Sequence, residues 1–102
     1  MSETAQYQLV IHRAAQKELA GVTGDTSSEL LTKLKSLKVL PNPLDQDYCE
    51  QLTNHENIFR VKVGNYRALC TLDKPTVYVL LIAPRARVYD RIDTAKERFN
   101  GR

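Results

Sequence analysis

Residues 58–91 read IFRVKVGNYRALCTLDKPTVYVLLIAPRARVYDR, and this stretch decides the fold. Apolar and charged residues alternate from Phe59 to Val63, and a period of two predicts a strand with one buried and one polar face. Gly64-Asn65 has the composition of a two-residue hairpin turn, and residues 73–75 are a second turn signal. Three consecutive strands are therefore expected, over residues 59–63, 66–72 and 76–83.

The first turn sets the register of the first two strands. With its glycine and asparagine in the turn, Lys62 lies opposite Arg67, and Arg60 lies on the same face. The other face of this strand pair carries Val61, Val63, Tyr66, Ala68 and Cys70. Like charges opposed across strands are destabilising, so the pattern indicates an anion or an acidic partner on the basic face. An ordinary solvated face, with long side chains that reach into water, is the alternative interpretation.

The N-terminal part of the chain predicts a strand and two helices. The run from Tyr7 to Ile11 is typical of a short strand, and residues 13–22 are good helix formers. Thr26 and Glu29 have the spacing of a capping box, which predicts a second helix that begins near Thr26 and ends before Pro41. We expect these two helices to pair as a hairpin.

The remaining segments complete an α+β order. Residues 41–57 are polar and rich in turn formers, which predicts a connector over the surface. Residues 90–99 have apolar side chains at helical spacing, and this pattern leaves open whether a terminal helix docks or frays. The predicted order is β-α-α-β-β-β-α, a small antiparallel-rich sheet with the helical hairpin on one face. A chain of 102 residues, 42% of them hydrophobic, is expected to form one domain over residues 1–102.

Composition and cysteine usage exclude several classes of protein. The formal net charge is +3, which permits a nucleic-acid partner without requiring one. The sequence shows neither a run of about 20 apolar residues nor a secretory signal, so a cytoplasmic protein without membrane contact is expected. Cys49 and Cys70 have no CxxC spacing, and Asp45, Asp47 and Glu50 lack the spacing of a calcium loop. We therefore expect reduced cysteines, no metal and no cofactor.

Four polar side chains follow the last strand at once. Arg85, Arg87, Tyr89 and Arg91 come directly after Pro84, which is expected to end the strand. A strand end is a rigid place from which to present side chains. Together with the basic face of the hairpin, these residues offer cations for phosphate groups and a ring for a base, which favours single-stranded RNA. A tyrosine that anchors the last helix is the structural alternative for Tyr89.

The same residues resemble the RelE/ParE superfamily of bacterial toxins from type II toxin–antitoxin pairs. The resemblance spans nearly the whole chain, and its motifs lie in RVKVGNYRALCTLD (60–73) and VLLIAPRARVYDR (79–91). The RelE branch implies a small toxin that cuts mRNA, usually in the ribosomal decoding site, and that is held inactive by a cognate antitoxin. The ParE branch implies a gyrase inhibitor of the same fold. A non-catalytic module that holds an acidic partner is the third interpretation.

The resemblance assigns roles to individual positions. The family's basic strand pair falls on Arg60 and Lys62, and its strand-start arginine, strand-end arginine and tyrosine fall on Arg67, Arg85 and Tyr89. Many members have a histidine where this chain has Pro84, and a lysine where it has Arg60. Since arginine is effectively always protonated and is a poor base, the groups that carry protons stay open.

The implied chemistry suits these side chains. Cleavage by the 2′-hydroxyl of the RNA needs a protein that orients the chain, stabilises charge on the phosphate and moves protons. We expect Arg67 and Arg85 to hold the phosphate, Lys62 to assist proton transfer, and Tyr89 to stack on a base or transfer a proton. The further candidates for contacts with RNA phosphates are Arg60, Arg87, Arg91, Lys33 and Lys35. For the two helix lysines, a solvated face is the simpler interpretation.

Overall fold

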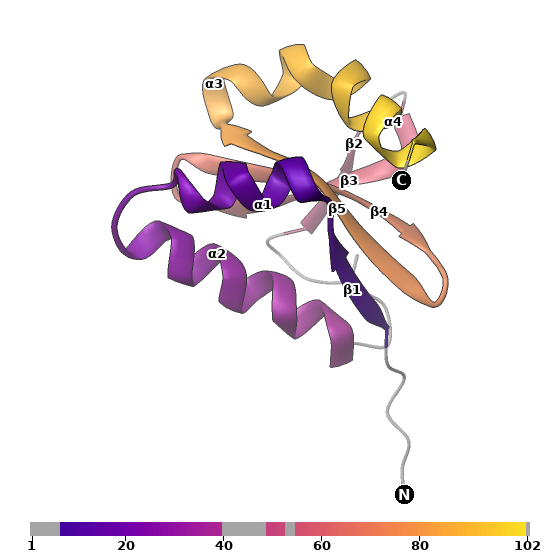
Figure 1. Cartoon of the computed structure of the whole chain (residues 1–102), viewed down its shortest axis with the longest axis horizontal. Coiled ribbons are helices and arrows are strands. Elements are labelled where there is room, and N and C mark those ends of the chain that lie inside the picture. Colours follow the sequence, from indigo (N-terminus) through magenta and orange to yellow (C-terminus); the bar gives the residue numbers. More distant parts are fainter. Residues whose placement is uncertain (1–6, 40–48, 53–54, 102) are drawn as a thin grey trace, which may run out of the picture.

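The computed structural model describes residues 7–39, 49–52 and 55–101. Five strands form one mixed sheet in the order β1-β5-β4-β3-β2 (Figure 1). The strands are β1 (Gln8–Ile11), β2 (Cys49–Leu52), β3 (His55–Val63), β4 (Tyr66–Asp73) and β5 (Thr76–Pro84). Only β1 and β5 are parallel, and the other three neighbouring pairs are antiparallel. The predicted α+β fold with an antiparallel-rich sheet is confirmed.

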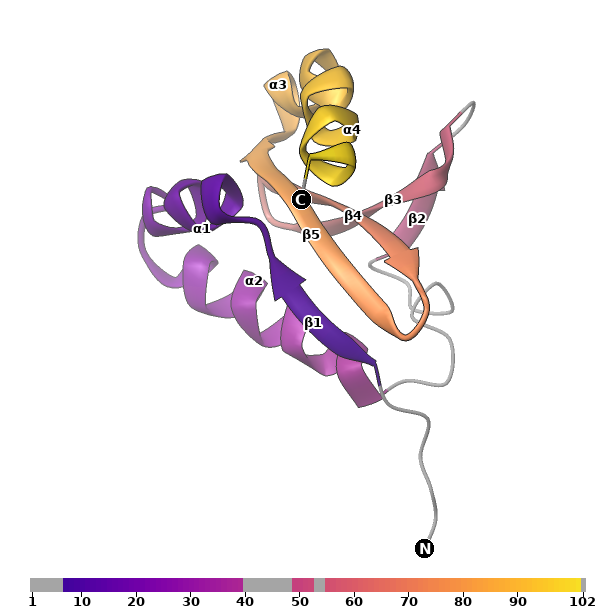
Figure 2. The same ribbon diagram turned by 45° about the vertical axis from the view of Figure 1, so that its right-hand side comes forward.

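Helices cover both faces of this sheet. On one face lie α1 (Arg13–Ala20) and α2 (Asp25–Ser36), which is followed by the 3-10 turn η1 (Leu37–Val39). Beyond β5 come α3 (Arg85–Val88), the 3-10 turn η3 (Tyr89–Arg91) and α4 (Ile92–Asn100), which lie on the other face (Figure 2). Within the described residues, no helix is long and apolar enough to cross a membrane.

The helical hairpin covers the apolar face that the strand pattern predicts. Leu30, Leu34 and Leu37 follow one another at helical spacing and are fully buried. They belong to one hydrophobic cluster with Val61 and Ala68 from the sheet. This cluster also contains Val63 and Cys70, with Tyr66 packed against it. Apolar burial on this face therefore fixes the orientation of β3 and β4, and so sends their cations to the opposite face.

A second, smaller core joins α4 to that opposite face. Ala95 is fully buried in a cluster with Leu69 and Leu81 of the sheet. Phe99 lies edge-on against Tyr78, with ring centroids 5.6 Å apart. The terminal helix therefore docks. The expectation that helices cover one face was incomplete, because Ile92, Ala95 and Phe99 give even this short helix an apolar side to bury.

Two local predictions differ from the structure. The connector expected over residues 41–57 contains β2 and the start of β3, and Asp45 and Asp47 lie outside the described residues. Helix α2 begins at Asp25, and its N-cap is Gly24, which has φ of +64° and makes no side-chain cap. Thr26 is already inside the helix, so the predicted capping box is wrong although the predicted start is one residue away.

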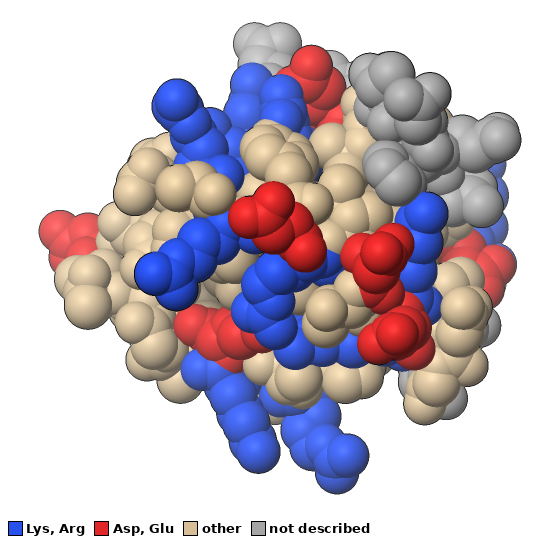
Figure 3. Space-filling view, turned by 90° about the horizontal axis from the view of Figure 1, so that it is seen from above, with Lys and Arg blue, Asp and Glu red and all other residues tan. Residues whose placement is uncertain are grey.

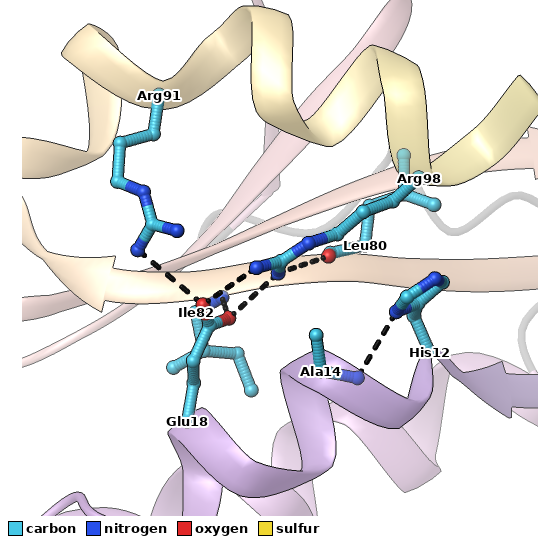
Figure 4. A network of polar contacts seen from close by, with 7 residues as sticks. All are labelled: His12, Ala14, Glu18, Leu80, Ile82, Arg91 and Arg98. Carbon is cyan, nitrogen blue, oxygen red and sulfur yellow. Dashed lines mark hydrogen bonds and ion pairs between the residues drawn. The ribbon is translucent and has the colours of Figure 1, made fainter. Parts of the chain in front are cut away.

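A carboxylate joins the two helical layers at the edge of β5. Strand β1 ends at Ile11, opposite Val79, so beyond this point no strand of the described residues neighbours β5 on that side. Glu18 of α1 accepts hydrogen bonds from the Ile82 amide at 2.9 Å and from Arg98 of α4 at 2.9 and 3.0 Å (Figure 4). Arg98 also donates to the Leu80 carbonyl at 2.9 Å. The two side chains therefore satisfy backbone groups that a longer β1 would have bonded.

Glu18 is held in its charged form. Burial alone would raise its pKa, but hydrogen bonds from Arg98 and the Ile82 amide, with the charges of Arg98 and Arg91, lower the pKa below its ordinary value of 4.5. A lowered pKa means that this carboxylate stabilises the fold fully above pH 4.5. The stabilisation is lost as the pH falls through the pKa of the folded protein.

Replacing Glu18 by alanine should therefore destabilise the protein strongly. The Ile82 amide and the Arg98 guanidinium lose their acceptor, and we expect the free energy of unfolding to fall by about 2–3 kcal/mol at neutral pH. Glu29→Ala, at an exposed position of α2, is the matched control and should change it by less than about 0.5 kcal/mol. Denaturant unfolding measures both. Equal losses, or a gap between wild type and Glu18→Ala that does not narrow below pH 4.5, would contradict this role.

Candidate nucleic-acid interface

The predicted register of the β3–β4 hairpin is confirmed. Val63 pairs with Tyr66 and Lys62 lies opposite Arg67 across a turn in which Gly64 has φ of +56°. Alternation places Arg60 on the same face as these two cations. The basic residues therefore lie on the face that α3 and α4 partly cover.

The end of β5 brings two more side chains over this face. Pro84 is the N-cap of α3, and the Arg85 amide donates to the Asn65 carbonyl at 2.7 Å, which ties the start of the helix to the hairpin turn. Arg85 and Tyr89 are four residues apart in consecutive helical turns and so share one side. Arg60 donates a hydrogen bond to the Tyr89 hydroxyl, and its guanidinium carbon lies 5.5 Å from the centroid of that ring.

Arg67 is the most enclosed cation of this group. Arg67 is only 9% exposed, and its Nη1 donates hydrogen bonds to the carbonyls of Gly64 at 3.0 Å and Tyr66 at 2.9 Å. Burial lowers its pKa from the ordinary value, and the charges of Arg60 and Arg85 lower it further. Within the described part of the chain, the buried Nε atoms of Arg60 and Arg67 have no hydrogen-bond partner. Unpaired buried donors between like charges are costly, so this arrangement suits a bound anion.

An acidic residue that the sequence did not reveal lies among these cations. Glu50 of β2 pairs with Arg60 of β3 and accepts a hydrogen bond from it, and its carboxylate lies 4.0 Å from Lys62 Nζ. The hydrogen bond and charge of Arg60, with the charge of Lys62, lower the pKa of Glu50. Because β2 has four residues and a register shift after Gln51, alternation alone could not have shown this strand.

The cluster formed by Glu50, Arg60, Lys62, Arg67, Arg85 and Tyr89 is called the basic site below. Arg87 is exposed on α3, whereas Arg91 turns toward Glu18, with Nη1 at 3.3 Å from its carboxylate (Figure 4). Lys33 and Lys35 belong to α2, which packs on the opposite face of the sheet. The structure therefore brings together five of the nine predicted residues, directs Arg91 to Glu18, places the two lysines on the opposite face and leaves Arg87 exposed on α3.

Basic and acidic side chains are mixed on the face of the molecule that Figure 3 shows. In the view of Figure 3, Lys and Arg side chains are interleaved with Asp and Glu side chains. Among the described residues, no group of three or more His, Cys, Asp or Glu could hold a metal ion. His12 instead caps α1, where its Nδ1 accepts from the Ala14 amide at 3.0 Å. The chemistry available at the basic site is charge stabilisation of an anion, with Lys62 and Tyr89 as groups that can carry protons.

The sheet order and the basic site define a small α+β protein whose cations gather at the end of its β-meander. No family model matches the sequence, and no curated protein matches it. Among solved structures, the fold is similar to that of a mutant of the Escherichia coli toxin RelE in the free state. That match has a TM-score of 0.69 and 19% identity, and covers 91% of this chain and 97% of that chain.

The similar structures include toxin–antitoxin complexes. One is the toxin–antitoxin complex RelBE2 from Mycobacterium tuberculosis, with a TM-score of 0.64, 20% identity, and coverage of 84% of this chain and 99% of that chain. Another is the RelE–RelB complex from the archaeon Pyrococcus horikoshii, with a TM-score of 0.66, 21% identity, and coverage of 80% and 98%. This protein therefore has the fold of the RelE toxins, as the resemblance in its sequence predicted.

Inorganic phosphate is a simple probe of the basic site. At a concentration of about five times its Kd, an ion that binds only the native state raises the free energy of unfolding by about 1 kcal/mol. This raises the Tm of a domain of this size by about 4–8 °C. We expect phosphate to stabilise the wild type more than Arg67→Met, measured by thermal unfolding at constant ionic strength. Equal shifts would reflect only the general exclusion of phosphate from protein surfaces and would contradict an anion site.

Proposed function

We propose that this protein is the toxin of a type II toxin–antitoxin pair and acts in the cytoplasm as a metal-independent endoribonuclease on mRNA at the ribosome. The observation that carries the proposal is the convergence of Arg60, Arg67 and Arg85, with two buried Nε atoms that have no partner among the described residues. An RNA phosphate offers the charge and the oxygen acceptors that these donors lack. The RelE-like fold supports the same assignment.

The reaction needs no nucleophile from the protein. The 2′-oxygen of the RNA forms a bond to the adjacent phosphorus, and the bond from phosphorus to the 5′-oxygen breaks. The 2′-hydroxyl gives up its proton, and the departing 5′-oxygen gains one. The protein must hold the phosphate in line, stabilise its added charge and accept and donate these protons.

The basic site contains groups for each of these tasks. Arg67 and Arg85 approach the same region from β4 and α3, and their guanidinium groups match two phosphate oxygens. Tyr89 accepts a hydrogen bond from Arg60 through its oxygen, and a phenol in that position still has its own O–H to donate. We assign proton donation to Tyr89 and proton transfer at the 2′-hydroxyl to Lys62, with Arg60 and Arg87 as phosphate contacts. For Lys33 and Lys35 of α2, on the opposite face of the sheet, we propose separate contacts with RNA phosphates.

A cognate antitoxin is the expected protein partner. The similar structures include complexes of toxins with their antitoxins. An acidic segment that covers the basic site would block RNA and neutralise the opposed cations at the same time.

Loss of two groups of the basic site should abolish toxicity. In the variant Arg85→Ala, Tyr89→Phe, the phosphate loses one guanidinium and the leaving oxygen loses its proton donor. Loss of one proton-transfer group alone slows such a step by about 10²–10⁴-fold. Growth after induction and mapping of mRNA 5′ ends are the measurements.

Arg13→Ala, at an exposed position at the start of α1, is the control and should remain fully toxic. Parental cleavage by the double variant would contradict the assigned roles. Breaks in DNA with intact mRNA would contradict the proposal as a whole and would favour a gyrase inhibitor of the same fold. Purified protein that never cleaves RNA, with or without ribosomes, would favour a non-catalytic binding module.

A further inference from the structure

Glu50 places a negative charge where the proposed substrate carries one. Its carboxylate accepts a hydrogen bond from Arg60 and lies 4.0 Å from Lys62 Nζ. A carboxylate and a phosphate both present oxygen acceptors to a guanidinium in the same planar geometry. The contacts of Glu50 therefore use donors that an RNA phosphate at this edge of the basic site would need.

The position of Glu50 allows this carboxylate to leave. It lies on β2, which is an edge strand of four residues, and its side chain is 53% exposed. The side chain of Arg60 is only 23% exposed and is also held by Tyr89. An exposed carboxylate exchanges its contacts for water at little cost, whereas the enclosed arginine stays in place. When an anion competes for Arg60, the glutamate is the partner that moves.

We propose that Glu50 is an internal counter-anion, which occupies Arg60 and Lys62 when no RNA is bound and is replaced there by an RNA phosphate. The inference concerns the regulation of the basic site and rests on the proposed binding of RNA. It also accounts for how two strands can carry Lys62 directly opposite Arg67 in the empty protein, since the neighbouring carboxylate offsets part of the repulsion.

This role has a cost for the substrate. Each RNA that binds must first displace a carboxylate, so the affinity of the wild type is lower than that of a protein with a neutral side chain at this position. The displacement also limits weak binding of unrelated polyanions, because only a phosphate held by further contacts at Arg67 and Arg85 compensates the loss.

The test is the affinity of Glu50→Gln for a short single-stranded RNA. Glutamine keeps the shape of the side chain and removes its charge. A 2′-O-methyl oligonucleotide serves as the probe, because it lacks the nucleophile and cannot be cleaved. An exposed ion pair contributes up to about 1 kcal/mol, and two cations are released here, so we expect Kd to fall by about 3- to 10-fold.

Two further measurements separate this role from a structural one. Glu29→Gln makes the same change of net charge on the opposite side of the sheet and should alter Kd by less than about 2-fold. In a variant that already carries Arg60→Gln and Lys62→Gln, the further change Glu50→Gln should no longer lower Kd.

The outcomes distinguish this inference from the proposed function. If the wild type cleaves mRNA but Glu50→Gln binds RNA no more tightly than the wild type, the counter-anion role is overturned and the proposed endoribonuclease activity is not affected. Tighter binding by Glu50→Gln in a protein that never cleaves RNA supports the counter-anion and overturns the enzyme. A wild type and a Glu50→Gln variant that both fail to bind the oligonucleotide overturn the counter-anion role, while cleavage of mRNA at the ribosome is decided separately by mapping mRNA 5′ ends after induction.

Discussion

The structure depends on how the free edge of β5 is completed. Strand β1 ends opposite Val79, yet β5 continues to Pro84 and starts the helix that carries Arg85 and Tyr89. Glu18 and Arg98 supply the hydrogen bonds that a longer β1 would have made along this stretch. Since one side chain comes from α1 and the other from α4, the same contact joins both helical layers to the strand. The far end of β5 is thereby connected to both helical layers, which fixes the position of the side chains at its tip.

Whereas the contacts of Glu18 and Arg98 stabilise the fold, the cations of the basic site destabilise it. Arg67 is buried beside two other arginines, and burial and charge both lower its pKa, so its cation is less stable in the fold than in water. Stability alone would favour an apolar side chain at this position. Unfavourable charge of this kind is typical of functional sites, and an anion beside Arg67 would offset it. The apolar cores on the two faces of the sheet offset this cost.

Sequence patterns predicted the parts of the fold that depend on residues close together in the chain, such as strand alternation and turns. Alternation and the Gly64 turn were enough for the β3–β4 register, because a slip of one residue would have turned Val61 and Val63 away from the helices. Strand β2 has four residues and a register shift, so its period is too short to detect. The bond of Glu18 to Arg98 joins residues 80 positions apart, and no pattern along the chain reports it. Glu50 escaped prediction for the same reason, since its partners come from pairing in space.

The electrostatics of the basic site also narrow the choice of proton carriers. Proline at position 84 has no titratable side chain, and its φ of −59° suits the N-cap that starts α3, so this position serves geometry. Arginines stay protonated and so hold charge without exchanging it. The lowered pKa of Glu50 makes its carboxylate a weaker base, because Arg60 stabilises the charged form. In the proposed reaction, Lys62 and Tyr89 are therefore the side chains of the basic site to which we assign the proton transfers, while Glu50 pairs with the positive charges of Arg60 and Lys62.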